Sequence, residues 1–258
     1  MTISHHVFTG PPSSAPPQGE QEFGAMAMAL AGAPAATEER LEIEVDGVTL
    51  FGDLVVPPHA QSLVVFAHGS GSSRHSPRNR WVAQALQAST HATLLFDLLT
   101  TREELADAKD GHLRFNIAFL ARRLVAVSRW LAEAPGTRDL AMGYFGASTG
   151  AAAALVAAAE LGPRVGAIVS RGGRPDLAAD AVSSVVAPTL LIVGSQDMHV
   201  LRLNQQVLSR LHCKKELLVV QGATHLFEET GALETVAQHA ARWFSRHLNP
   251  QKSRSTEH

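Results

Sequence analysis

Short apolar runs alternate with longer helical stretches from residue 41 onward. Residues 41–45 alternate apolar and polar positions, Asp46-Gly47 marks a turn, and residues 49–56 form a second strand-like run, which predicts an antiparallel hairpin at a sheet edge. Unbroken apolar runs, which are typical of strands buried on both faces of a parallel sheet, follow at residues 63–67, 92–96, 140–145, 165–169, 189–193 and 217–220.

Helical patterns separate these runs, notably at residues 113–134, 148–161, 201–212 and 233–248. Alternating β and α elements predict the α/β class, with a mostly parallel, eight-stranded, doubly wound sheet and helices on both faces. Ligands of such sheets bind outside the carboxyl ends of the strands. No long insertion interrupts residues 170–188, so we expect no large cap domain and an open site.

The chain ends have a different composition from its centre. Five of the 13 prolines lie within residues 1–40, mixed with Gly and Ser, which predicts a flexible N-terminal arm before a domain at 41–249 and a tail at 250–258. Residues 23–36 are apolar and small, as in a signal peptide. However, no Lys or Arg precedes Arg40, so we expect a cytoplasmic protein rather than a secreted or periplasmic one.

Charge and cysteine content exclude several classes of partner. Lys and Arg number 22 against 24 Asp and Glu, without a block of like charges, so a nucleic-acid or anionic-membrane surface is not expected. No apolar run reaches the ~18 residues of a membrane span. The single Cys213 lacks a partner for an internal disulfide and the paired spacing of a zinc or redox site. A small-molecule partner fits best, and the sequence leaves monomer and homodimer open.

A serine stands between one strand and one helix in Gly146-Ala147-Ser148-Thr149-Gly150. The turn from strand to helix is so tight that only small residues fit around Ser148, and this geometry exposes the hydroxyl above the sheet edge. The helix N-terminus adds backbone N–H donors beside it. Ser148 is therefore a candidate nucleophile. The alternative is a helix N-cap serine packed among glycines.

A nucleophilic serine needs a base and an acid that orients the base. Asp197 follows the strand at 189–193, and His225 follows the strand at 217–220, so both should lie at the same sheet edge as Ser148. The chain order Ser148, Asp197, His225 is that of an α/β-hydrolase triad. Asp197 alone also fits a turn residue. A rival acid, Asp176, is better explained as a helix N-cap.

Backbone amides near Ser148 predict an oxyanion hole. The N–H of Thr149 is one donor, and the glycine-rich loop after residues 63–67 supplies a second, Ser70 first and Gly71 next. The same loop could cradle a phosphate, but it lacks the Gly-Lys-Ser/Thr ending of a P-loop. His68 precedes this loop and is expected to be a structural hydrogen-bonding residue rather than a base.

These motifs resemble those of a known family over residues 41–248. His68-Gly69-Ser70-Gly71, Gly146-Ala147-Ser148-Thr149-Gly150, Gly194-Ser195-Gln196-Asp197 and Gly222-Ala223-Thr224-His225 resemble the α/β-hydrolase superfamily, and with the segment 170–176 they resemble its dienelactone-hydrolase-like group. Dienelactone hydrolases proper have a cysteine nucleophile, where this chain has Ser148. The resemblance implies a serine hydrolase of esters or lactones with no metal and no cofactor.

Substrate contacts are expected from two segments. The long loop at residues 98–112 is placed to cover the serine, with Thr101 as a contact, unless it is simply solvated surface. Arg171 and Arg174 could bind a substrate carboxylate, or could form structural ion pairs with Asp176 or Asp180.

The leading hypothesis is a carboxylic ester hydrolase that acts through an acyl-enzyme. An acyl-homoserine-lactone lactonase or a thioesterase would use the same triad, because specificity depends on the pocket walls. A hypothesis from another class is a non-catalytic protein that binds a small ligand on this fold.

Overall fold

An eight-stranded sheet forms the centre of the protein. The computed structural model describes residues 36–248. The strands are β1 (Thr37–Val45), β2 (Val48–Val56), β3 (Ser62–Ala67), β4 (Ala92–Phe96), β5 (Ala141–Ala147), β6 (Ala167–Arg171), β7 (Thr189–Gly194) and β8 (Lys215–Val220). Their order is β1-β2-β4-β3-β5-β6-β7-β8. Strands β3 to β8 run parallel, while β2 is antiparallel to both β1 and β4. The predicted sheet and its edge hairpin are confirmed.

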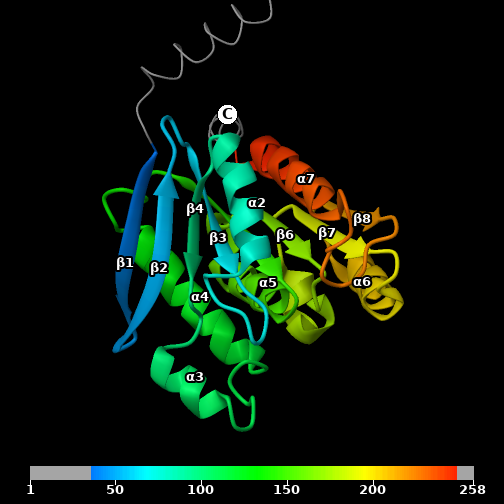
Figure 1. Ribbon diagram of the computed structural model, residues 1–258, viewed down its shortest axis with the longest axis horizontal. Helices are drawn as coiled ribbons and strands as arrows, with labels where there is room; N and C mark the ends of the chain where they lie inside the picture. Colours follow the sequence, from blue (N-terminus) through cyan, green and yellow to red (C-terminus); the bar gives the residue numbers. More distant parts are fainter. Residues whose placement is uncertain (1–35, 249–258) are drawn as a thin grey trace, which may run out of the picture. The chain divides into compact units, whose positions relative to one another are not determined.

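Helices cover both faces of this sheet (Figure 1). They are α2 (Pro77–Ala88), α3 (Thr101–Asp107), α4 (Ile117–Leu131), α5 (Thr149–Leu161), α6 (Met198–Arg210) and α7 (Ala232–His247), with the 3₁₀ segments η1 (Gly162–Arg164) and η2 (Pro175–Ser184). Successive strand residues point to opposite faces: Val65 and Tyr144 pack in the core under α4 and α5, whereas Val64 and Phe145 pack under α2 and α7. This double winding brings every β-to-α loop of the parallel strands to one edge.

The hairpin begins earlier than the sequence pattern predicted. β1 starts at Thr37, and its residue Arg40 pairs with Asp53 of β2. Residues 37–40, which we had placed in the arm, are exposed and carry no apolar signal. Backbone pairing at a sheet edge requires no buried side chain, so hydrophobic patterning could not reveal them. Residues 1–35 of the predicted arm and the predicted tail lie outside the described residues.

Two helices were not predicted, and one of them lies in the segment that we expected to be a loop. α2 begins with Ser76, whose Oγ accepts the Asn79 N–H at 3.3 Å, followed by Pro77. α3 begins at a capping box between Thr100 and Glu103. The prediction of a loop through residues 98–112 is therefore wrong in its middle. Polar capping residues start both helices, and this signal is separate from apolar periodicity.

Only η2 lies between β6 and β7, so no large cap covers the sheet edge within residues 36–248, as predicted. We expected β8 to be buried on both faces, but most of its residues are half-buried or exposed. The reason is that β8 is the last strand of the sheet. Among the helices of the described chain, none is long and apolar enough to cross a membrane.

Candidate active site

Ser148 occupies a strained turn between β5 and α5. Its φ of 50° and ψ of −121° lie in a region that side chains other than glycine rarely adopt. A Cβ on Gly146 would come within 2.4 Å of Ala151 Cα, and one on Gly150 within 2.2 Å of the Ala67 carbonyl oxygen. Both glycines are therefore required by backbone packing. Ser148 holds the N-cap position of α5, but its hydroxyl makes no capping hydrogen bond to this helix.

Asp197 and His225 form a direct pair. His225 Nδ1 lies 2.6 Å from Asp197 Oδ2, and the His225 side chain is 40% exposed against 14% for Asp197. Asp197 is also the N-cap of α6, where its Oδ1 accepts the Val200 N–H at 3.4 Å. Because the carboxylate can only accept, Nδ1 carries the proton and Nε2 keeps a lone pair suited to a general base.

Asp176, the rival acid, is engaged elsewhere. Both of its carboxylate oxygens accept from Arg174, at 2.9 Å from Nε and 2.8 Å from Nη2. It lies in the first turn of η2 and is not the N-cap that we predicted, since Arg174 holds that position. The structure thus pairs His225 with Asp197 and Asp176 with Arg174.

The loop after β6 connects the serine to the histidine. The Ser148 N–H donates to the Arg171 carbonyl at 3.2 Å, and the Ser148 carbonyl accepts the Arg174 N–H at 3.1 Å. A Cβ on the intervening Gly172 would stand 3.5 Å from Cε1 of His225. The imidazole thus lies against the same loop that holds Ser148. No hydrogen bond joins Ser148 Oγ to His225 among the described residues, as is common for catalytic pairs without substrate.

The loop predicted to form the oxyanion hole lies against Ser148. A Cβ on Gly69 would be 3.1 Å from Ser148 Cβ. The Ser70 N–H, our first choice for the second donor, donates to Thr149 Oγ1 at 2.9 Å. The N–H groups of Thr149 and Gly71 have no acceptor within the described part of the chain. The loop that carries Ser70 and Gly71 therefore begins against Ser148, but the Ser70 N–H is already occupied.

His68 holds this loop in place. Its Nε2 accepts the Leu98 N–H at 3.0 Å, so its Nδ1 carries the proton and donates to the Gly69 carbonyl at 3.0 Å. Burial lowers the pKa of His68, against weaker opposing effects of the Gly69 bond and Asp97. A neutral, doubly bonded His68 is the structural hydrogen-bonding residue that the sequence predicted.

A cavity of about 600 Å³ lies beside the glycine-rich loop that contacts Ser148. Gly69, Ser70 and Gly71 form one wall, and Leu98 and Leu99 form apolar parts of its lining. Ser148 does not itself line the cavity, but its contact with Gly69 places it at the boundary. Arg78, Arg114 and Glu104 add charge to the lining. The space suits the acyl or alcohol part of a small substrate.

The three expected substrate contacts have different surroundings. Arg174 forms the structural ion pair that was its alternative. Thr101 is an exposed residue at the start of α3. None of the three residues is part of the cavity lining. Arg171 is buried, donates to Asn79 Oδ1 at 3.2 Å and lies over the Phe227 ring. Burial, with a contribution from Arg78, lowers the pKa of Arg171 to about 10. Among the described residues, no carboxylate neutralises it.

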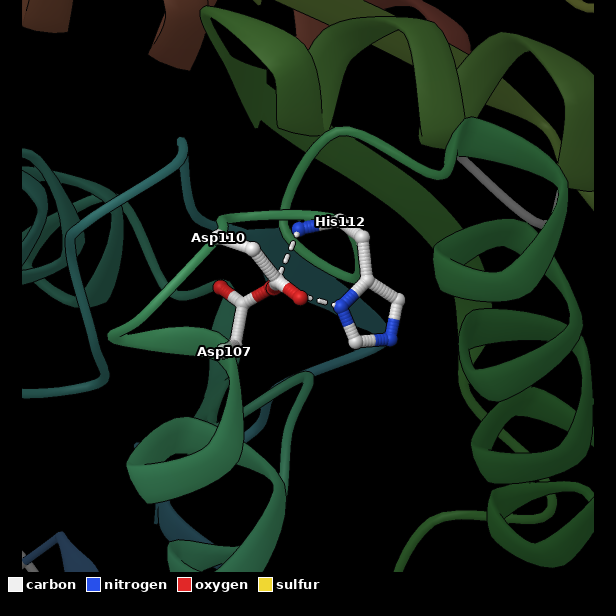
Figure 2. A group of neighbouring side chains, drawn as sticks. All are labelled: Asp107, Asp110 and His112. Carbon is white, nitrogen blue, oxygen red and sulfur yellow. Dashed lines mark hydrogen bonds and ion pairs between the residues drawn. The ribbon is translucent and has the colours of Figure 1, made fainter.

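Asp107, Asp110 and His112 gather after α3 and have ligand atoms within 4.8 Å of one another (Figure 2). The carboxylate of Asp107 already accepts from the Arg114 side chain and from the backbone N–H groups of Leu113 and Arg114. Asp110 Oδ1 accepts from the backbone and Nδ1 of His112. Hydrogen bonding within the loop accounts for this cluster, which we do not assign as a metal site.

Asn204 was missed by the sequence analysis. It is fully buried in α6, and its Nδ2 donates to the carbonyls of Gly173 at 3.0 Å and Val200 at 2.8 Å. It thereby ties the loop between Ser148 and His225 to the helix that begins at Asp197. A polar residue within an amphipathic helix is normally exposed, so nothing in the local pattern distinguishes Asn204.

Comparison with known proteins shows the family to which the chain belongs. The model of the "Dienelactone hydrolase family" matches residues 94–252. The chain belongs to the dienelactone hydrolase family. A solved dienelactone hydrolase from Anabaena variabilis is 53% identical with a TM-score of 0.82, covering 84% of this chain and 100% of that one. Est1E from Butyrivibrio proteoclasticus is 16% identical, covers 83% of this chain and 98% of its own, and shares the fold with a TM-score of 0.66.

Curated relatives of this family member have a different kind of name. Two Mycobacterium tuberculosis proteins, each named "Putative phosphoribosyl transferase", are 55% identical over 215 residues. The match covers 83% of this chain but 48% of each relative. The chain therefore spans about half the length of the curated relatives that it matches. The name of these relatives describes whole proteins, of which about half lies outside the match.

Proposed function

We propose that this family member is a serine hydrolase that cleaves carboxylic esters or lactones of small molecules. The observation that carries the proposal is that Ser148 stands at a strained turn beside the loop after β6, and that this same loop packs against His225. His225 is in turn bonded to Asp197 at 2.6 Å. A nucleophile, a base and an orienting acid at one sheet edge are the parts required for acyl transfer.

The reaction runs in two steps. His225 Nε2 takes the proton of Ser148 as Oγ attacks the carbonyl carbon, and the resulting oxyanion faces Thr149 and the Ser70–Gly71 loop. Collapse breaks the ester bond, His225 protonates the leaving alkoxide, and the acyl group stays on Ser148. Water, deprotonated by His225, then attacks the acyl-enzyme and releases the acid. Asp197 holds the imidazole in the required tautomer throughout.

Arg171 is our proposed contact for a substrate carboxylate. A buried guanidinium is costly unless it is neutralised. Within residues 36–248, the side-chain partners of Arg171 are only Asn79 and the Phe227 ring. The same triad would serve an acyl-homoserine-lactone lactonase or a thioesterase. A panel of p-nitrophenyl esters, lactones and thioesters separates these by kcat/KM. The transferase name of the mycobacterial relatives belongs to proteins of which the match covers 48%, so we do not extend that activity to this chain.

Labelling with a fluorophosphonate tests the function. We expect one covalent adduct, mapped to Ser148 by mass spectrometry of digested protein, and no adduct in Ser148→Ala or His225→Ala. Ser183→Ala removes an exposed serine of η2 and should label like the original protein. No adduct in a folded sample would instead favour the non-catalytic binding protein, whereas labelling that persists in Ser148→Ala would refute Ser148 as the nucleophile.

A further inference from the structure

The hydroxyl of Thr149 is an unassigned donor beside the nucleophile. Thr149 is 4% exposed, and its Oγ1 accepts the Ser70 N–H at 2.9 Å. A hydroxyl has one proton to donate besides its two lone pairs. Among the described residues, no acceptor takes that proton. This proton, next to Ser148, is therefore available to a bound substrate.

Covalent geometry sets where this proton can point. In the staggered rotamers that bring Oγ1 near the backbone amide, Oγ1 lies about 3 Å from the amide nitrogen of its own residue. The Thr149 N–H is the amide that follows the nucleophile, and it has no acceptor in the described chain. One residue can therefore present an N–H and an O–H to the same oxygen atom.

The bond from Ser70 makes the hydroxyl a better donor. Accepting a hydrogen bond polarises an O–H, and chains of hydrogen bonds strengthen one another inside a protein. Thr149 is also the first residue of α5, where the positive end of the helix dipole favours negative charge. The Ser70 N–H points at Thr149 Oγ1 and not at the substrate position, so it acts on that position only by polarising the Thr149 hydroxyl.

We propose that Thr149 Oγ1–H donates a hydrogen bond to the oxyanion, with the Ser70 N–H behind it as a relay. This inference rests on the proposed acyl transfer. The hydroxyl keeps its proton throughout, so it stabilises charge and transfers nothing. Its contribution is greatest when the carbonyl oxygen becomes an oxyanion, and so it should affect kcat more than KM.

The opposite role is chemically possible and gives the opposite result. Oγ1 occupies the place to which the Ser70 N–H points, so it could shield that amide until substrate displaces it. Removing the hydroxyl would then free the Ser70 N–H for the oxyanion and leave kcat unchanged or raised. The two roles therefore differ in the sign of one measurement.

The test compares Thr149→Val, which has nearly the same shape, with Thr149→Ser, which retains the hydroxyl. We expect Thr149→Val to lower kcat for p-nitrophenyl acetate by about 10- to 100-fold with KM within threefold, and Thr149→Ser to stay within about fivefold. The Ki of a phenylboronic acid, which forms a tetrahedral adduct with Ser148, should rise in Thr149→Val by a similar factor.

Unchanged or raised kcat in Thr149→Val overturns the proposal, as does an equal loss in Thr149→Ser. If Thr149→Val fails to fold, Thr149→Ala gives the same comparison, since it also removes the hydroxyl. Fluorophosphonate labelling of Ser148 in the unmodified protein is measured first. Its absence refutes the proposed function, whereas labelling with an unaffected Thr149→Val refutes only the role of the hydroxyl.

Discussion

Gly150→Ala distinguishes the effect of local helix propensity from that of tertiary packing, because the two predict changes of opposite sign in the free energy of unfolding. Gly150 lies in the first turn of α5, where alanine is favoured over glycine by about 1 kcal/mol in a helix. In the folded chain, however, a Cβ at this position would stand 2.2 Å from the Ala67 oxygen and 2.4 Å from the His68 oxygen. Real Cβ atoms essentially never approach other atoms within 3.0 Å. α5 and the end of β3 must therefore move apart by close to an ångström.

The structure gives a magnitude for this change. Forcing an extra methyl group into a packed interior costs about 3 kcal/mol when the neighbours are backbone atoms that cannot rotate away. The gain in helix propensity offsets about 1 kcal/mol of this, which leaves a loss of about 2 kcal/mol in the free energy of unfolding. For a domain of this size the melting temperature should fall by roughly 4–8 °C.

Urea denaturation followed by far-UV circular dichroism measures the effect. Gly136→Ala is the matched control, because a Cβ there has nothing within 4 Å and the backbone has no positive φ. We expect the control to stay within about 0.5 kcal/mol of the original protein or to be slightly stabilised. A Gly150→Ala midpoint at or above that of the original protein would refute the packing argument.

Three further outcomes follow from the same contacts. Because burial lowers the pKa of His68, the folded state binds its proton less readily than the unfolded state. Stability is therefore present above the unfolded pKa near 6.5 and is lost as the pH falls below it. Urea midpoints at pH 7.5 and 5.5 should show this loss, at most about 1.4 kcal/mol per pH unit for one group, and a smaller one in His68→Gln. If His68→Gln lost as much stability between pH 7.5 and 5.5 as the original protein, the role assigned to His68 would be wrong. Arg174→Ala should leave kcat/KM within twofold and cost no more than about 1 kcal/mol, since its pair with Asp176 is partly exposed. A tenfold fall in kcat/KM would make Arg174 a substrate contact after all. Dialysis against EDTA should change neither esterase activity nor melting temperature, because Asp107 is already bonded to Arg114 and the backbone. Activity restored only by added metal would argue otherwise.

What the sequence by itself determined was periodic or local. Unbroken apolar runs predicted the parallel strands because burial on two faces leaves a continuous hydrophobic signal, and the alternating pattern with the Asp46-Gly47 turn predicted the hairpin. The motif around Ser148 was identified because a tight turn admits only small residues, and Asp197 and His225 because each follows a strand that ends at the same edge. Elements without such a signal were missed or displaced, as in the first residues of β1 and the capped helix α3.

Only the tertiary structure decided which polar groups meet. Arg174 and Asp176 are two residues apart, and the sequence left open whether the arginine pairs with this carboxylate or with substrate. Ser70 and Thr149 are 79 positions apart, so their hydrogen bond had no local signature, and neither had the bond from Asn204 to Gly173. Hydrogen bonds depend on distance and direction in three dimensions, whereas hydrophobic patterning depends on which face of an element is buried. For that reason the sequence predicted the framework of the site, and the folded chain decided the contacts within it.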